Sequence, residues 1–173
     1  QREEELNGFF TNYPYVDIVV HGMGEWPFAS ILQRRLENKS FQGIESTSYA
    51  NKISEFGYIS NPHSQENFRR DVNKLPSPFI DNTFDKILEE NRDLISGTLW
   101  ETNRGCPFSC SFCVQGDDIF NKVLNFSIER LDKELDWIGR NKMPYIFCTD
   151  ANFGMIKRDP EIALRICETR EKY

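Results

Sequence analysis

The hydrophobic and polar positions of the first forty residues predict one strand followed by one helix. Residues 16–20 form a short, nearly continuous apolar run, which is typical of a buried strand. A turn with two glycines, residues 22–25, follows this run, and the next apolar residues recur at the spacing of a single helix face. That face consists of Phe28, Ile31, Leu32 and Leu36. Together these residues predict one β-α unit.

The pattern changes between residues 41 and 95, which we interpret as a connector. Residues 43–64 alternate over short stretches, as the strands of a hairpin do. Residues 75–90 first place Pro76 and Pro78 in an extended segment, because proline disfavours helical backbone, and then predict a short helix. We therefore expect this region to link two α/β parts.

After Gly97 the patterns of strand and helix alternate again. Residues 97–102 predict a short strand, a cysteine-rich stretch follows it, and residues 144–149 predict a second buried strand. A helical stripe lies between the two strands, with Ser127 positioned as its N-cap. The stripe consists of Ile128, Leu131, Leu135 and Ile138. Residues 159–161, Asp-Pro-Glu, predict the N-cap, proline and acidic residue that begin a further helix.

This order of elements implies parallel strands, and parallel strands determine where a site would lie. Strands joined by a right-handed crossover place their following loops at the same edge of the sheet. The cysteine-rich loop and the loop at 148–154 should therefore face each other at the carboxyl ends of two strands. This is the edge where α/β proteins build their sites.

The composition excludes several classes of protein. A hydrophobic fraction of 39% and a charged fraction of 28% are typical of a folded, water-soluble chain. No apolar run approaches the roughly 20 residues that a membrane-spanning helix needs, and a net charge of -6 argues against a nucleic-acid-binding surface. Five cysteines is an odd number and no secretory signal is visible, so we expect reduced thiols in the cytoplasm rather than a disulfide framework.

Three of the five cysteines fall within eight positions, a spacing that lets one loop direct three sulfurs at a single metal centre. They are Cys106, Cys110 and Cys113. A structural zinc site usually needs four ligands, but Cys148 lies in a predicted strand and Cys167 on a predicted helix face, as core cysteines do. His21 and His63 are far away in the sequence. Three thiolates can instead hold an iron–sulfur cluster and leave one iron for another ligand.

The spacing Cys106-x3-Cys110-x-Phe112-Cys113 resembles the motif of radical S-adenosylmethionine (SAM) enzymes, including the aromatic residue before the third cysteine. Residues 100–113 resemble the cluster loop of that family. The proline-containing segment at 75–85 resembles its connector, and residues 16–28 resemble the end of the cobalamin-binding domain that precedes the barrel in a large subgroup. The chain is thus similar to cobalamin-binding radical SAM enzymes over nearly its whole length.

The resemblance implies an α/β fold in three parts. Residues 1–40 would be the C-terminal part of a Rossmann-like cobalamin-binding domain, and residues 41–95 a linker with a hairpin and a proline-rich connector. Residues 96–173 would be the first β-α units of a partial radical SAM (β/α) barrel. Such domains contain further β-α units on both sides, so we expect the chain to be a fragment of a longer enzyme. A fragment would expose apolar sheet surface and tend to aggregate.

The resemblance also implies cofactors and a reaction. Cys106, Cys110 and Cys113 would each hold one iron of a 4Fe-4S cluster, and the fourth iron would bind the amino and carboxylate groups of SAM. The reduced cluster would cleave SAM to a 5′-deoxyadenosyl radical, with electrons from a donor such as flavodoxin or ferredoxin. Cobalamin-dependent methyl transfer is the expected reaction. Radical cyclisation, rearrangement and methylthiolation are the alternatives, on an unknown small-molecule or peptide substrate.

Six further residues are candidate cofactor contacts by the same resemblance. They are Phe112, Asp150, Asn152, Gly22, Gly24 and Glu25. Phe112 would lie near the adenine of SAM, or would pack the loop as a core aromatic. Asp150 or Asn152, where the family often has a Gly-Gly-Glu-like segment, would accept a hydrogen bond from the SAM ammonium, and a turn or cap is the alternative for Asp150. The turn at 22–25 would lie near cobalamin, or would serve only as a strand-to-helix turn.

Other interpretations of the cysteines stay open. They could form a zinc- or iron-holding clip in a non-catalytic interaction module, which would need its metal to fold. They could also bind nothing in an inactive remnant, which predicts thiols that react freely with a reagent. Arg104, beside the first cysteine, either tunes the charge of a cluster or forms a surface ion pair.

Overall fold

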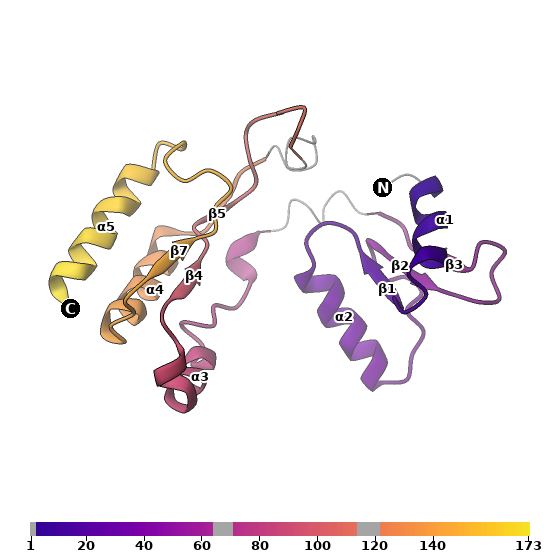
Figure 1. Cartoon of the computed structure of the whole chain (residues 1–173), viewed down its shortest axis with the longest axis horizontal. Helices are drawn as coiled ribbons and strands as arrows, with labels where there is room; N and C mark the ends of the chain where they lie inside the picture. The colour runs from indigo at the N-terminus through magenta and orange to yellow at the C-terminus, as the bar shows by residue number, and fades with distance from the viewer. Residues whose placement is uncertain (1–2, 64–70, 114–121) are drawn as a thin grey trace. The chain divides into compact units, whose positions relative to one another are not determined.

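The chain forms two compact units in the computed structural model, Gln1–Arg70 and Asp71–Tyr173 (Figure 1). The structure describes residues 3–63, 71–113 and 122–173. Both units combine helices with short strands, as the α/β class expected from the sequence requires. None of the helices in these described residues is long and apolar enough to cross a membrane.

The first unit contains a three-stranded antiparallel sheet and two helices in its described residues. Its elements are α1 (Glu3–Asn12), β1 (Ile18–Val20), α2 (Glu25–Leu36), β2 (Thr47–Ala50) and β3 (Tyr58–Ser60). The central strand is β2, with Val19 of β1 opposite Ser48 and Ile59 of β3 opposite Tyr49. Apolar side chains of α1, β1 and β3 and of the segment before β1 form its core: Leu6, Phe10, Tyr58, Phe9, Val16 and Val19.

The β-α unit predicted at 16–36 is present, but the apolar face of its helix is largely exposed. Phe28, Leu32 and Leu36 are 55%, 49% and 85% exposed, whereas Pro27 of α2 is buried. Periodicity predicts which side of a helix is apolar, because it depends on the helix alone. It does not predict which element covers that side.

The hairpin predicted in the connector lies in the first unit. Its strands are β2 and β3, and β2 continues the sheet from β1 through backbone pairing. The two compact units meet between residues 70 and 71. The domain limits at residues 40 and 95 stay a prediction. The identity of each unit as part of a particular domain stays a prediction.

The second unit contains a parallel strand pair, an antiparallel strand pair and three α-helices in its described residues. Its elements are η2 (Val72–Lys74), α3 (Thr83–Asn91), η3 (Arg92–Leu94), β4 (Thr98–Trp100), β5 (Asn103–Arg104), β6 (Leu124–Asn125), α4 (Ile128–Arg140), β7 (Ile146–Cys148) and α5 (Asp159–Lys172). β4 and β7 are parallel, with Leu99 opposite Phe147 and Trp100 opposite Cys148. This pairing confirms the predicted parallel strands with α4 between them in the sequence. β5 and β6 pair antiparallel.

Helix α4 buries the stripe predicted from the sequence. It begins after Ser127, whose hydroxyl accepts a hydrogen bond from the backbone N–H of Arg130 at 3.3 Å, so the predicted N-cap is confirmed. Leu131, Leu135 and Ile138 are 0%, 1% and 3% exposed. The helix is thus fixed by its apolar face against the rest of the unit.

Helix α5 begins differently from the prediction. Asp159 is not its N-cap but its first residue, and the Asp159 carboxylate is buried. It accepts hydrogen bonds from the backbone N–H groups of Gly154 and Ile156, at 2.7 and 3.0 Å. The prediction of a cap was wrong because this side chain binds the loop before the helix instead of the first turn.

A buried carboxylate, Glu134, joins three segments of the second unit. Ser77 Oγ, Trp100 Nε1 and Arg130 Nε donate hydrogen bonds to it at 2.7, 2.8 and 2.8 Å. Glu134 is 3% exposed, and a buried charge is stable only when it is paired and hydrogen-bonded. Glu134 therefore holds the segment before α3, strand β4 and helix α4 in one arrangement.

Candidate functional site

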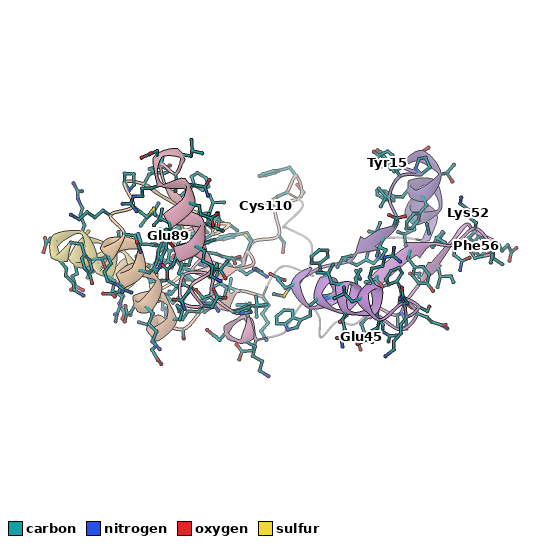
Figure 2. All side chains as sticks on the ribbon, turned by 90° about the horizontal axis from the view of Figure 1, so that it is seen from below. Tyr15, Glu45, Lys52, Phe56, Glu89 and Cys110 are labelled. Carbon is teal, nitrogen blue, oxygen red and sulfur yellow. The ribbon has the colours of Figure 1, made fainter. Side chains whose placement is uncertain are left out.

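The loop that follows β5 carries the three closely spaced cysteines. Cys106 is buried, whereas Cys110 and Cys113 are exposed, and the backbone N–H of Cys113 donates to the carbonyl of Cys110 at 3.0 Å. Figure 2 shows Cys110 on the extended loop, away from the helices of the second unit. All five cysteines of the chain are free thiols. Gly105, with a φ of 105°, makes the turn into Cys106 in a conformation that favours glycine.

The chemistry of this loop fits an iron–sulfur cluster better than it fits zinc. Three free thiols on one short loop are the donor set that a cluster uses, and the described part of the loop, residues 105–113, contains no histidine, carboxylate or fourth cysteine as a further zinc ligand. Within the described residues, no group of three or more histidine, cysteine or acidic side chains is gathered for metal binding. The loop therefore offers the ligands without holding them in final coordination geometry.

The loop after β7 lies against the residues that lead into the cysteines, as the parallel strand order predicts. The backbone N–H of Thr149 donates to the carbonyl of Trp100 at 2.8 Å. Asp150 accepts hydrogen bonds from the backbone N–H groups of Thr102 and Asn103, at 2.6 and 3.1 Å, and from the side-chain amide of Asn103 at 2.7 Å. The hydroxyl of Thr102 also donates to Asp150. Asp150 thus accepts four hydrogen bonds from the segment immediately before the cysteine loop.

Asn152, two residues further along, contacts a cysteine directly. Its side-chain nitrogen Nδ2 donates to Cys106 Sγ at 2.9 Å. The structure therefore brings together three of the residues singled out in the sequence, Cys106, Asp150 and Asn152, although 44 or more positions separate the cysteine from the other two in the chain.

Phe112 points away from any core. It is 91% exposed, so the alternative in which it packs the loop as a core aromatic does not hold in this structure. Contact with adenine stays a prediction. Arg104 forms a two-point ion pair with Glu101, with Nε and Nη2 at 2.9 and 2.7 Å from its carboxylate oxygens. This pairing agrees with the surface-pair alternative for Arg104.

The two remaining cysteines differ from each other. Cys148 lies at the end of β7 and is half-buried, and burial raises the pKa of its thiol, which favours the neutral form. Cys167 was expected on a core face of α5 but is exposed. That expectation was wrong because α5 buries Ile162 and Asp159 rather than a full apolar stripe.

The turn at 22–25 lies in the first unit, between β1 and α2. Gly22 is exposed with a φ of 84°, which favours glycine, and Gly24 is the N-cap residue of α2. A side-chain carbon added at Gly24 would meet no atom within 4 Å, so the turn is open on that side. Glu25 occupies the first turn of the helix and is exposed. An open turn fits the approach of a large ligand.

Two histidines that are far apart in the sequence lie together beside this turn. The ring centroids of His21 and His63 are 4.5 Å apart, and His21 Nε2 is 2.9 Å from Ser48 Oγ. Burial, and then the nearby His63, lower the pKa of His21 to about 4. Separation in the sequence hid the pair of histidines. His21 follows β1 and His63 lies after β3, and only the pairing of both strands with β2 places them in one sheet.

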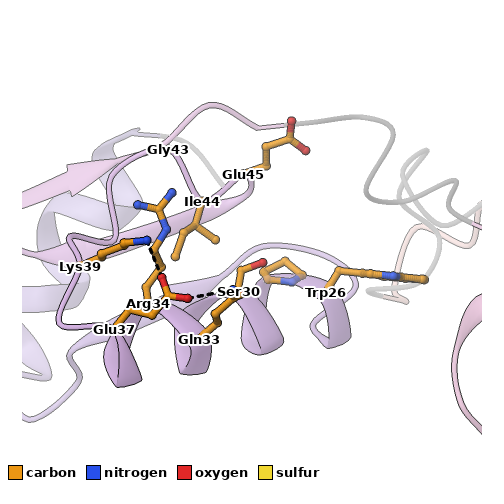
Figure 3. A pocket seen from close by; sticks show the side chains of 10 residues that line it. Trp26, Ser30, Gln33, Arg34, Glu37, Lys39, Gly43, Ile44 and Glu45 are labelled. Atoms are coloured by element: carbon orange, nitrogen blue, oxygen red, sulfur yellow. Dashed lines mark hydrogen bonds and ion pairs between the residues drawn. The ribbon is translucent and has the colours of Figure 1, made fainter.

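A pocket of about 740 Å³ lies along α2 in the same unit (Figure 3). Its charged lining consists of two cations and two carboxylates, Arg34, Lys39, Glu37 and Glu45. Lys39 pairs with Glu37 at 2.7 Å, and Arg34 donates to the carbonyl of Ser40 at 3.1 Å. With its charges balanced, the pocket has no net charge that would select an ionic ligand.

Two curated methyltransferases are similar in sequence to this chain. The 2-(S-pantetheinyl)-carbapenam-3-carboxylate methyltransferase of Streptantibioticus cattleyicolor is 36% identical to it over 166 residues. The cobalamin-dependent radical SAM methyltransferase TokK of Streptomyces tokunonensis is 35% identical over 165 residues. Each alignment covers 94% of this chain and 24% of the relative, so the chain spans about a quarter of the length of these relatives. No family model matches the chain.

Solved structures with a similar fold bind the cofactors expected from the sequence. OxsB, a cobalamin-dependent SAM radical enzyme with aqua-cobalamin and SAM bound, aligns with a TM-score of 0.65 at 23% identity, over 97% of this chain and 23% of that one. TsrM from Kitasatospora setae, with cobalamin and a [4Fe-4S] cluster bound, aligns with a TM-score of 0.64 at 17% identity, over 96% of this chain and 33% of that one. At these identities the likeness establishes the fold.

Proposed function

Because this chain is homologous, over 94% of its length, to methyltransferases of the cobalamin-dependent radical SAM class, we propose that it is part of an enzyme of that class. It would bind a 4Fe-4S cluster and SAM in the second unit, and cobalamin beside the first. The substrate is an unknown small molecule or peptide, and reduction needs a donor such as flavodoxin or ferredoxin.

The observation that carries this proposal is the position of the cysteine loop. Cys106, Cys110 and Cys113 follow one strand of a parallel pair, and the loop after the other strand contacts the first of them. Each thiolate would hold one iron, which leaves one iron of the cluster for SAM. The reduced cluster, when bound, supplies the electron that cleaves SAM.

Asp150 and Asn152, the two residues expected to accept from the SAM ammonium, differ in whether they can still accept a hydrogen bond. All four lone-pair positions of the Asp150 carboxylate are used by Thr102 and Asn103, so this residue is engaged in holding the loop. Asn152 is therefore the better candidate to accept from the SAM ammonium, through its side-chain oxygen. Phe112 is exposed and could lie against the adenine.

For cobalamin we propose the turn of the first unit. Gly22 and Gly24 leave backbone accessible at the end of β1, and Glu25 is an exposed residue beside them. Backbone without side chains lets a broad ligand approach closely. Binding of hydroxocobalamin, followed by its visible absorption, would test this part separately from the cluster.

The cluster is tested first by chemical analysis of the chain after anaerobic reconstitution. We expect about four irons and four sulfides per chain, and an electron paramagnetic resonance spectrum of the reduced protein that changes when SAM is added. The triple variant C106A/C110A/C113A should lose the iron. The double variant C148A/C167A is the matched control and should keep it, because neither thiol lies on the loop.

Two results would contradict the proposal. Stoichiometric zinc without sulfide would mean that the loop is a structural clip in a non-catalytic module. A cluster whose spectrum ignores SAM would mean that this chain holds the metal but no SAM site.

A further inference from the structure

We propose that Asn152 is a positioning residue for the first cluster ligand, and that its hydrogen bond to Cys106 raises the reduction potential of the cluster. This inference rests on the proposed function, since it concerns the same cysteine loop. It differs from the SAM contact considered above, because it uses the side-chain nitrogen of Asn152 and not its oxygen.

The three cysteines have unequal surroundings. Cys110 and Cys113 are exposed, whereas Cys106 is 7% exposed and its sulfur accepts from Asn152 Nδ2 at 2.9 Å. The Cys106 thiol is therefore held in place before any metal binds, whereas the thiols of Cys110 and Cys113 are exposed to solvent.

The backbone before Asn152 is anchored to the same segment that leads into Cys106. Thr149 extends the ladder of β7 to the carbonyl of Trp100, at 2.8 Å. Asp150 then binds the backbone of Thr102 and Asn103, which are both buried. The chain is therefore anchored at Asp150, two residues before Asn152, and this anchor holds Thr102 and Asn103, which lie shortly before Cys106.

The backbone after Asn152 is anchored as well. The buried carboxylate of Asp159 accepts from the N–H groups of Gly154 and Ile156, at 2.7 and 3.0 Å. The neighbouring Arg158 donates to the carbonyl of Thr102 at 2.5 Å. Because the backbone is bound on both sides of Asn152, its side-chain amide is already directed at Cys106, and no free loop has to become ordered first. Residues that support a metal ligand from behind act in this way.

The sign of the effect follows from charge. Reduction adds an electron to a cluster whose thiolates already carry negative charge, and a hydrogen-bond donor to a sulfur stabilises that charge. The bond from Asn152 should therefore favour the reduced cluster. Its removal should make reduction harder.

The test is the midpoint potential of the reconstituted cluster, measured without SAM so that no SAM contact contributes. N152L removes the donor while keeping the size of the side chain, and we expect the equilibrium constant for one-electron reduction to fall about tenfold, equivalent to a shift of about 59 mV to lower potential. N152D places a carboxylate at the sulfur and should lower the potential further. N91L is the matched control, since Asn91 Nδ2 donates to the carbonyl of Ile87 at the end of α3.

A purely structural role would give a different result. If Asn152 only packed the loop, N152L would reduce the iron content but leave the midpoint of the remaining clusters equal to that of the parent chain. Equal midpoints in the parent chain, N152L and N152D would overturn the redox part of the inference. The order parent, N152L, N152D from highest to lowest potential would support it.

A second measurement needs no metal. In the metal-free chain, amide hydrogen exchange of residues 102–106 should become about threefold faster or more in N152L, with α4 unaffected, because the loop loses one of its anchors. Unchanged exchange would overturn the positioning part. A parent chain that binds no iron and sulfide would overturn the proposed function, and the redox part with it, while the exchange measurement still decides the positioning part.

Discussion

Asp150 accepts hydrogen bonds from the backbone and the side chains of two buried residues that precede it by 47 and 48 positions. D150N would keep one acceptor oxygen for the backbone N–H groups of Thr102 and Asn103, but it would place an NH2 group against the side-chain amide of Asn103, which is also a donor. We expect the free energy of unfolding of the second unit to fall by about 2–4 kcal/mol. Urea unfolding followed by tryptophan fluorescence would measure this loss, with D93N as the control at an exposed aspartate. Equal midpoints for D150N and D93N would contradict the role of Asp150 as an anchor.

His21 gives the first unit a dependence on pH. Its pKa is about 4 in the folded chain and 6.5 in the unfolded chain, so the unfolded chain binds the proton more readily between these values. Stability is therefore complete above pH 6.5 and is lost as the pH falls from 6.5 towards 4. We expect a loss of about 2 kcal/mol, because water near the exposed His63 screens part of the effect.

The variant H21Q separates this histidine from other titrating groups. Glutamine keeps a polar side chain beside Ser48 but has no proton to gain in this range. Circular dichroism during urea unfolding at pH 7 and pH 4.5 should show a smaller difference for H21Q than for the parent chain. The same pH dependence in both proteins would exclude His21 as its source.

At the scale of elements, the parallel pair of β4 and β7 depends on a glycine. A side-chain carbon at Gly97 would lie 2.7 Å from the carbonyl oxygen of Tyr145, which is backbone and cannot move aside easily. We expect G97A to lower the free energy of unfolding of the second unit by about 2–3 kcal/mol. G24A is the control, since its new carbon would meet no atom within 4 Å and should cost less than about 1 kcal/mol. Thermal unfolding of both variants would decide whether the contact at Gly97 limits the pairing.

The elements also show what a sequence can and cannot predict. The parallel pair, α4 and its cap at Ser127 followed from local patterns, because periodicity and capping involve neighbouring residues. The pairing of β2 with β1 could not be predicted in this way, because the sequence of a short strand does not indicate which other strand it will pair with. The contacts of Asp150 and Asn152 with the cysteine segment were visible only as a shared sheet edge, because the bonded partners are 46 or more positions apart in the sequence.

At the scale of the whole molecule, one face of the parallel pair is apolar and exposed. Leu99 and Phe147 are opposite each other in the register and are 66% and 52% exposed. Exposed apolar sheet surface promotes association. We expect L99K/F147E to reduce self-association, measured by sedimentation velocity. The urea midpoint should change little, because neither side chain is buried and the two new charges are opposite in sign. Equal self-association in the parent chain and the double variant would show that other surfaces cause it.

The bond between Asn152 and Cys106 also has a consequence for the order of events during synthesis. The asparagine is added 46 residues after the cysteine, which at roughly 5–20 residues per second takes about 2–9 seconds on the ribosome. During this interval the cysteine loop has been made, but the strand and loop that support its first thiol have not. For the cluster proposed above, iron delivered to a nascent chain would meet an unsupported loop, so its insertion would be expected after β7 and the start of α5 have been translated.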